Sequence, residues 1–157
     1  MIVYHLLRTA KLVYHYNNPN QFVDVLGLAP TKELKKNMNK ANRDLAKHYG
    51  YQNRAWHKVK GSAAHHIVAG TGKRAEPARK VLQKYGINID GADNGIYLKH
   101  MCKCSNQPGA YHREIHTDVY YQNVNARIMN ADRRGKQAVL KELDSIRNDL
   151  LFNRKIW

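Results

Sequence analysis

Residues 63–68 read Ala-Ala-His-His-Ile-Val, and this mostly apolar run predicts a short strand that ends at the Gly-Thr-Gly turn of residues 70–72. A second run, Ile-Tyr-Leu at 96–98, follows the turn-forming residues 90–95 and predicts a second strand. Between the two, residues 76–85 show the spacing of apolar positions that is typical of a helix. The expected centre of the fold is therefore two short strands that a helical insert separates.

Helical periodicity surrounds this centre on both sides. Residues 32–49 carry apolar side chains every three to four positions and lysines or arginines on the other face, which predicts an amphipathic basic helix. We expect two further helices, at about residues 111–130 and 136–152. The sequence thus predicts an α+β fold that is mostly α, with residues 31–157 as one domain.

The charge of the chain indicates its kind of partner. Of 157 residues, 27 are Lys or Arg and 12 are Asp or Glu, so the formal net charge is +15. Such a charge favours a polyanionic partner and excludes an acidic disordered segment. The most basic stretch, residues 31–60, has a net charge of +7. Hydrophobic residues make up 43% of the chain, which is enough to form a core.

Cysteines and long apolar runs are both scarce. The two cysteines, Cys102 and Cys104, cannot form a framework of several disulfides, and we predict ordinary reduced thiols. Together with His100 they form an incomplete zinc ligand set. The chain has no run of about 18 apolar residues, so we expect neither a membrane span nor a membrane partner. A standard signal peptide is not expected either.

Four histidines stand out by their spacing. His112 and His116 are four residues apart in a predicted helix, so their rings share a face and can bind one metal ion. Because the chain has nine histidines, a pair of this spacing also arises by chance, and spacing alone leaves both interpretations open. His65 and His66 are adjacent, and adjacent side chains of a regular strand point to opposite faces. Both can serve one site only where the strand ends or is distorted.

The order of these pieces is more specific than any one of them. The Ala-His-His of residues 64–66, the Asn-Gly of residues 94–95 and the His-x-x-x-His of residues 112–116 resemble the AHH family of nucleases within the HNH/endonuclease VII superfamily. The resemblance covers about residues 61–121. It implies a ββα-metal finger with flanking helices.

The resemblance also implies a role for each site residue. It makes His66 the general base and gives Asn94 the task of orienting the loop and the base. One divalent metal ion, whose identity among Mg, Zn, Mn and Ni stays open, would be held by the ligands His65, His112 and His116.

These residue types suit phosphodiester hydrolysis, which needs a base that is neutral near pH 7 and a cation that neutralises phosphate charge. Three imidazole ligands leave open positions on the ion for phosphate and water. We therefore expect a metal-dependent endonuclease that cleaves DNA. Two alternatives stay open. One is an RNase on the same scaffold, because backbone charge attracts both polymers, and the other is a non-enzymatic nucleic-acid-binding module whose histidines hold a structural zinc.

The N-terminal segment has a resemblance of its own. Residues 16–30, which run from Tyr-Asn-Asn-Pro to Gly-Leu-Ala-Pro, resemble the end of an Rhs-type core, with Val25 where that pattern has Pro. The resemblance implies that residues 1–30 are a remnant of this core or its linker and that residues 31–157 are a toxin domain. It further implies a secreted effector that is delivered into the cytoplasm of a target bacterial cell, and an immunity protein that keeps it inactive in the producer.

Overall fold

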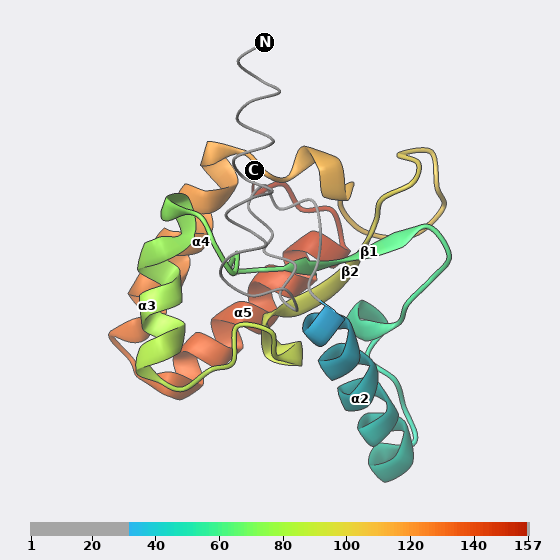
Figure 1. Cartoon of the computed structure of the whole chain (residues 1–157), viewed down its shortest axis with the longest axis horizontal. Coiled ribbons are helices and arrows are strands. Elements are labelled where there is room, and N and C mark those ends of the chain that lie inside the picture. The colour runs from blue at the N-terminus through green and yellow to red at the C-terminus, as the bar shows by residue number, and fades with distance from the viewer. Residues whose placement is uncertain (1–31, 157) are drawn as a thin grey trace, which may run out of the picture.

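The computed structural model describes residues 32–156, and these form an α+β fold that is mostly helical. One antiparallel sheet of two strands lies at its centre, with helices on both sides (Figure 1). The predicted fold class is confirmed, and the arrangement is compatible with a ββα-metal nuclease fold. The segment 1–30, for which the sequence predicts an Rhs remnant, lies outside the described residues.

The sheet consists of β1 (Ser62–His66) and β2 (Gly95–Lys99). Their register pairs Ser62 with Lys99 at one end and His66 with Gly95 at the other. The insert between them contains the 3₁₀ turns η2 (Lys73–Ala75) and η3 (Ala92–Asn94), and the helix α3 (Glu76–Lys84). Because β1 ends at His66, the adjacent histidines stand at the strand end, where the strict alternation of a regular strand stops.

Three helices form the main body of the fold. α3 packs against α4 (Asp118–Asp132), and α4 packs against α5 (Lys136–Leu151) (Figure 1). α5 also contacts β2, so the sheet closes one side of the core. The core is made of fully buried aliphatic side chains from all of these elements: Ile67, Leu82, Ile96, Leu98, Ile128, Leu143, Ile146 and Leu150.

The basic helix α2 (Lys32–Tyr49) packs on the sheet from the other side, and its C-terminal end extends away from the body (Figure 1). Leu34 and Met38 form a second small core with Ala64 and Tyr97. Gly95 makes this approach possible, because a Cβ there would lie 2.6 Å from the sulfur of Met38. The apolar face predicted for this helix is partly correct. Its apolar residues Ala41 and Leu45 are only half-buried, and the polar residue Asn42 is buried.

The carbonyl of Gly95 ties several elements together opposite His66. It accepts a hydrogen bond of 3.1 Å from the indole Nε1 of Trp56, in the 3₁₀ turn η1 (Arg54–Trp56). It accepts another of 3.1 Å from Nε of Arg147 on α5, whose guanidinium also donates to the carbonyl of Asp93. The start of β2 is therefore held from two directions.

The predictions for residues 32–49, 76–85 and 136–152 are confirmed to within one residue. The single helix predicted over residues 111–130 is wrong. The structure has a 3₁₀ turn, η4 (His112–Glu114), and a separate α4 that begins after Thr117. Thr117 has extended backbone angles, and its hydroxyl accepts a hydrogen bond from the backbone N–H of Tyr120. This N-cap places the first residue of α4 at Asp118, and three residues separate the helix from η4.

The prediction of free thiols is also wrong, because a disulfide joins Cys102 and Cys104 across one residue. It closes a local turn in the loop after β2 and spans too short a stretch to link distant elements. Among the residues described, no helix combines the length and the apolar character that crossing a bilayer requires.

Candidate metal centre and its histidines

His65, His112 and His116 meet at one point of the structure, although their backbones belong to different elements. His65 comes from β1, His112 from η4, and His116 from the residues just before α4. Their ring centroids lie 5.0–5.2 Å apart, and each ring offers one nitrogen within 4.8 Å of the others. The shared helical face that the sequence predicted for His112 and His116 does not exist. The 3₁₀ turn brings the same two rings together instead.

The tautomer of His65 follows from its contact with Tyr120. The Tyr120 hydroxyl has one proton, which it donates to the carbonyl of Ile67 at 2.9 Å. The same oxygen lies 3.0 Å from Nε2 of His65, so it must accept a hydrogen bond from that nitrogen. The proton of neutral His65 is therefore on Nε2, and its lone pair is on Nδ1. That Nδ1 is buried and has no hydrogen-bond partner within the part of the chain that the structure describes.

The other two rings are held from outside in the same way. Nδ1 of His112 lies 2.9 Å from Nδ1 of His100, and Nδ1 of His116 lies 3.4 Å from the hydroxyl of Tyr121. Both rings point their Nε2 atoms inward, 3.3 Å from each other. Ligand histidines in proteins have this arrangement, in which one nitrogen binds the ion and the other has an outer partner.

The spacing of the inner nitrogens fits a metal ion. Two ligands that each lie about 2.0–2.1 Å from a tetrahedral ion are separated by about 3.3–3.4 Å. The Nε2 atoms of His112 and His116 have this separation. His65 adds a third imidazole to this pair, and its Nδ1 has no hydrogen-bond partner within the described residues. The donor set therefore fits a divalent ion with open coordination positions.

Burial keeps two rings of this cluster, His65 and His112, uncharged. Burial, together with the nearby His116, lowers the pKa of His112 to about 3. The same causes lower the pKa of His65 well below its ordinary value. Burial raises the pKa of the Tyr120 hydroxyl well above its ordinary value. The hydroxyl therefore stays protonated and donates its hydrogen bond to the Ile67 carbonyl. Near neutral pH, His65 and His112 are thus neutral, which is the state in which imidazole binds metal.

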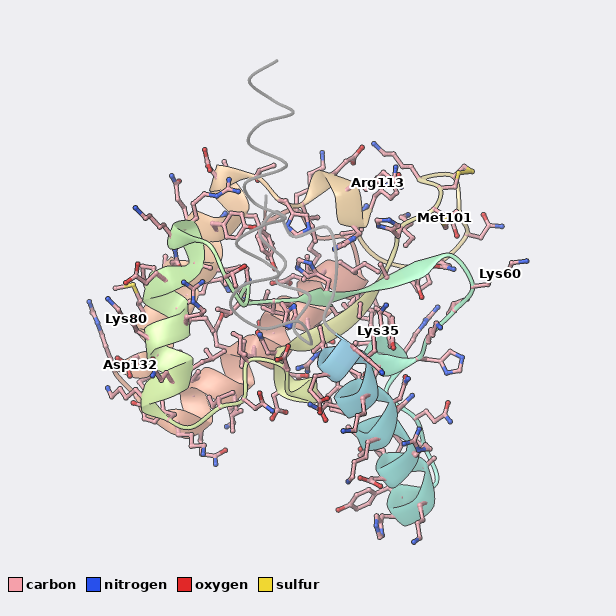
Figure 2. All side chains as sticks on the ribbon, viewed as in Figure 1. Lys35, Lys60, Lys80, Met101, Arg113 and Asp132 are labelled. Carbon is pink, nitrogen blue, oxygen red and sulfur yellow. A yellow bond between two sulfur atoms is a disulfide. The ribbon has the colours of Figure 1, made fainter. Side chains whose placement is uncertain are left out.

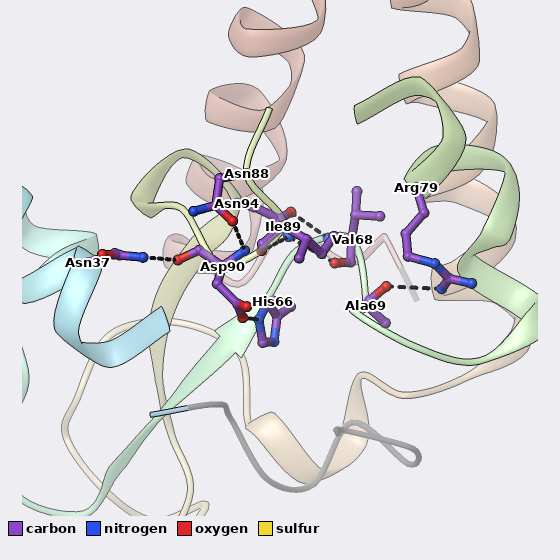
Figure 3. A network of polar contacts seen from close by, with 9 residues as sticks. All are labelled: Asn37, His66, Val68, Ala69, Arg79, Asn88, Ile89, Asp90 and Asn94. Atoms are coloured by element: carbon purple, nitrogen blue, oxygen red, sulfur yellow. Dashed lines mark hydrogen bonds and ion pairs between the residues drawn. The ribbon is translucent and has the colours of Figure 1, made fainter. Parts of the chain in front are cut away.

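His66 lies at the end of β1 and stands outside the three-histidine cluster. Its side chain is 1% exposed, and its Nε2 lies 2.8 Å from Oδ1 of Asp90 (Figure 3). Its Nδ1 is buried and, among the described residues, has no hydrogen-bond partner. The structure thus gives the two adjacent histidines different partners, a tyrosine hydroxyl for His65 and a carboxylate for His66.

Asn94 lies fully buried at the end of η3 and holds two loops together. Its Oδ1 accepts a hydrogen bond from the N–H of Val68 at 2.8 Å, and its Nδ2 donates to the carbonyl of Val68 at 2.9 Å (Figure 3). Nδ2 also donates to the carbonyl of Ile89 at 2.8 Å. These contacts are with the backbone that follows His66 and with the residue that precedes Asp90.

Sequence reasoning missed several residues of the site. Asp90 stands in an Asp-Gly pair typical of a turn, and no local pattern indicates that its carboxylate meets His66. His100 was considered only as part of a zinc set with the cysteines, whereas it contacts His112. Tyr120 is a buried aromatic residue beside Val119, which is a pattern typical of a core position, but it also fixes the tautomer of His65.

Two paired strands, a helix that follows them and a cluster of three histidines are compatible with the ββα-metal fold of HNH/endonuclease VII-type nucleases, which use a divalent metal ion. The model of one family, described as AHH, a nuclease family of the HNH/ENDO VII superfamily with conserved AHH, matches residues 46–150. The match covers more than half of the chain, and the chain belongs to this family. Its own Ala-His-His stands at residues 64–66. Searches of curated proteins and of solved structures gave no match.

Membership supports the nuclease prediction and a nucleic-acid substrate. Hydrolysis is the corresponding reaction class, and the histidine cluster suits the divalent ion that HNH-type nucleases use.

Proposed function

We propose that this protein is a metal-dependent endonuclease that hydrolyses DNA, with His66 as general base and with His65, His112 and His116 as metal ligands. The observation that carries the proposal is the convergence of three imidazole rings, one of which, His65, has a buried Nδ1 that lacks a partner within the described chain. A bound divalent ion would supply Lewis-acid stabilisation of the phosphate charge.

The chain's own residues supply the rest of the reaction. The His66 ring accepts the proton of the attacking water. Asn94 holds the backbone that follows His66, at Val68, and the backbone that precedes Asp90, at Ile89. Tyr120 holds His65 in the tautomer that a metal ligand needs. Because imidazole ligands are neutral, His65, His112 and His116 would leave the full charge of a bound ion available to the phosphate.

Plasmid cleavage by the wild type and by His66→Ala, His112→Ala and His116→Ala, with metal affinity measured by calorimetry, tests these roles. The wild type should nick supercoiled DNA with added Mg²⁺, Mn²⁺, Zn²⁺ or Ni²⁺ and stop in chelator. His66→Ala should lower the rate by roughly 10²-fold or more and keep the metal affinity. His112→Ala and His116→Ala should lose both, because each removes one donor.

Structured RNA serves as the parallel substrate in this assay. Cleavage of RNA alone would assign the scaffold to ribonuclease activity. Metal binding without cleavage of either polymer, together with unfolding in chelator, would assign it to a structural zinc module. Equal loss of metal affinity in all three variants would show that His66 is a ligand rather than a base.

We further propose that helix α2 contacts the DNA backbone. Opposite the face that packs on the sheet, the helix has four exposed cations: Lys36, Lys40, Arg43 and Lys47. Lys35, near the start of the helix in Figure 2, is half-buried. Lys36 and Lys40 have acidic partners on the helix, Glu33 and Asp44. Within residues 32–156, Lys35, Arg43 and Lys47 form no ion pair, so these three are free to meet phosphate.

Salt dependence tests the α2 proposal, measured as DNA affinity of a cleavage-dead His66→Ala protein. Each phosphate contact contributes about −0.9 to the slope of log affinity against log salt concentration. Replacing Lys35, Arg43 and Lys47 together with Gln should therefore flatten the slope by about two units or more. The matched control removes three exposed cations that form no ion pair within residues 32–156 and that lie between the end of α4 and the start of α5, away from α2: Arg133, Arg134 and Lys136 (Figure 1). Equal slopes for both triple variants would contradict the proposal.

We also propose that this nuclease is the toxin domain of an Rhs-type protein, because residues 16–30 resemble the end of an Rhs core. In this proposal residues 1–30 are a core remnant or linker and residues 31–157 are the toxin domain. The protein acts as an effector in the cytoplasm of a target bacterium, and an immunity protein neutralises it in the producer. Family membership supports the nuclease part of this proposal.

Expression in the bacterial cytoplasm tests the toxin proposal. Induction of the wild type should arrest growth with loss of chromosomal DNA, because no immunity protein is present. His66→Ala, expressed to the same level, should leave growth and DNA content unchanged. Normal growth with an active, soluble wild-type nuclease in the same cells would overturn it.

A further inference from the structure

The contact between Asp90 and His66 carries an inference that rests on the proposed function. Asp90 Oδ1 lies 2.8 Å from Nε2 of His66, and the side chains are 14% and 1% exposed. Asp90 belongs to the loop between α3 and η3, near the end of the insert that separates the two strands. This loop lies beside the end of β1, so the carboxylate of Asp90 meets His66. The carboxylate lies outside the three-histidine cluster.

The loop that carries Asp90 is held by three asparagine side chains (Figure 3). Asn37 of α2 donates to the carbonyl of Asp90 at 3.0 Å, and Asn88 accepts a hydrogen bond from its N–H at 3.0 Å. Asn94 donates to the carbonyl of the preceding residue, Ile89, at 2.8 Å. Amides from α2, from the loop itself and from η3 thus fix the backbone on both sides of Asp90, and this limits the positions open to its carboxylate.

A carboxylate is only an acceptor, so the hydrogen bond to Asp90 requires the proton of neutral His66 to be on Nε2. The lone pair is then on Nδ1, the buried nitrogen for which the described chain offers no hydrogen-bond partner. Nδ1 is therefore the atom that can take a proton from water. Once it does, the imidazolium ring carries a positive charge 2.8 Å from the carboxylate that stabilises it.

We propose that Asp90 is the positioning residue of the general base. It holds His66 in the Nε2–H tautomer, with Nδ1 as the base atom, and it stabilises the ring after proton transfer. Asp90 acts through His66 and need not touch the substrate or the metal ion.

The tautomer can be measured without any variant of Asp90. Long-range ¹⁵N–¹H correlation spectra of the zinc-loaded and metal-free wild type at about pH 8, where ordinary imidazole is neutral, distinguish Nε2–H from Nδ1–H rings. His66→Ala identifies the His66 signals. The proposal predicts the Nε2–H form with a protonated nitrogen that exchanges slowly, and an Nδ1–H ring would overturn it.

Kinetics of Asp90→Asn separate positioning from a structural role. An amide can turn its NH₂ group toward Nε2 and so favours the wrong tautomer. We expect kcat for plasmid nicking to fall by roughly 10²-fold or more, while KM for DNA and the metal affinity stay within about twofold. Asp93→Asn, an exposed carboxylate in the same connection, is the matched control and should retain wild-type kcat.

The outcomes are distinguishable from those of the proposed function. A wild-type kcat in Asp90→Asn would overturn the inference and leave the nuclease proposal intact. Loss of metal affinity or a lowered melting temperature with unchanged kcat would show that Asp90 only stabilises the loop, which also overturns it. If the wild type cleaves neither DNA nor RNA, the proposed function fails, and the tautomer spectra still decide whether Asp90 orients His66.

Discussion

The pairing between Asn94 and the backbone just after β1 is the constraint on which the site depends. Val68 exchanges two hydrogen bonds with the Asn94 side chain, and the N–H of Ile67 donates to the Asn94 carbonyl at 2.8 Å. The two strands are separated by a long insert, so the sheet needs such a closure at the end where His66 pairs with Gly95. Removing the buried amide would leave backbone groups unsatisfied, at about 1–3 kcal/mol for each.

The site divides its chemistry between two kinds of histidine environment. His65, in the cluster, has a neutral outer partner, the hydroxyl of Tyr120, and burial keeps its ring uncharged. His66 has a carboxylate partner, Asp90, and in the proposed mechanism charge is most useful there because a base becomes positive when it accepts a proton. In the proposed mechanism, imidazole ligands would preserve the charge of a bound ion, and the acidic group would serve the base. Adjacent residues of one strand end thus obtain opposite electrostatic surroundings.

Much of this arrangement was predictable, for identifiable reasons. The helices at residues 32–49 and 136–152 have strong apolar periodicity, and the ordered histidine motifs indicated the residues that the structure brings together. The helix break at Thr117 was missed because the continuing apolar spacing outweighed a Thr-Asp cap signal. Asp90 and the outer partners of the cluster act across the fold, and local patterns in a single sequence carry no record of such contacts. The Cys102–Cys104 bond is local, but the spacing of two cysteines does not by itself decide whether their thiols are oxidised.

Anomalous diffraction from crystals soaked in zinc or manganese tests most directly whether one ion binds to His65, His112 and His116. We predict a single strong peak at about 2.0–2.2 Å from Nδ1 of His65 and from the Nε2 atoms of the other two. A peak on Nε2 of His65 would contradict the tautomer that Tyr120 imposes. An ion bound at His100, or no peak in the cluster at saturating metal, would contradict the metal centre itself.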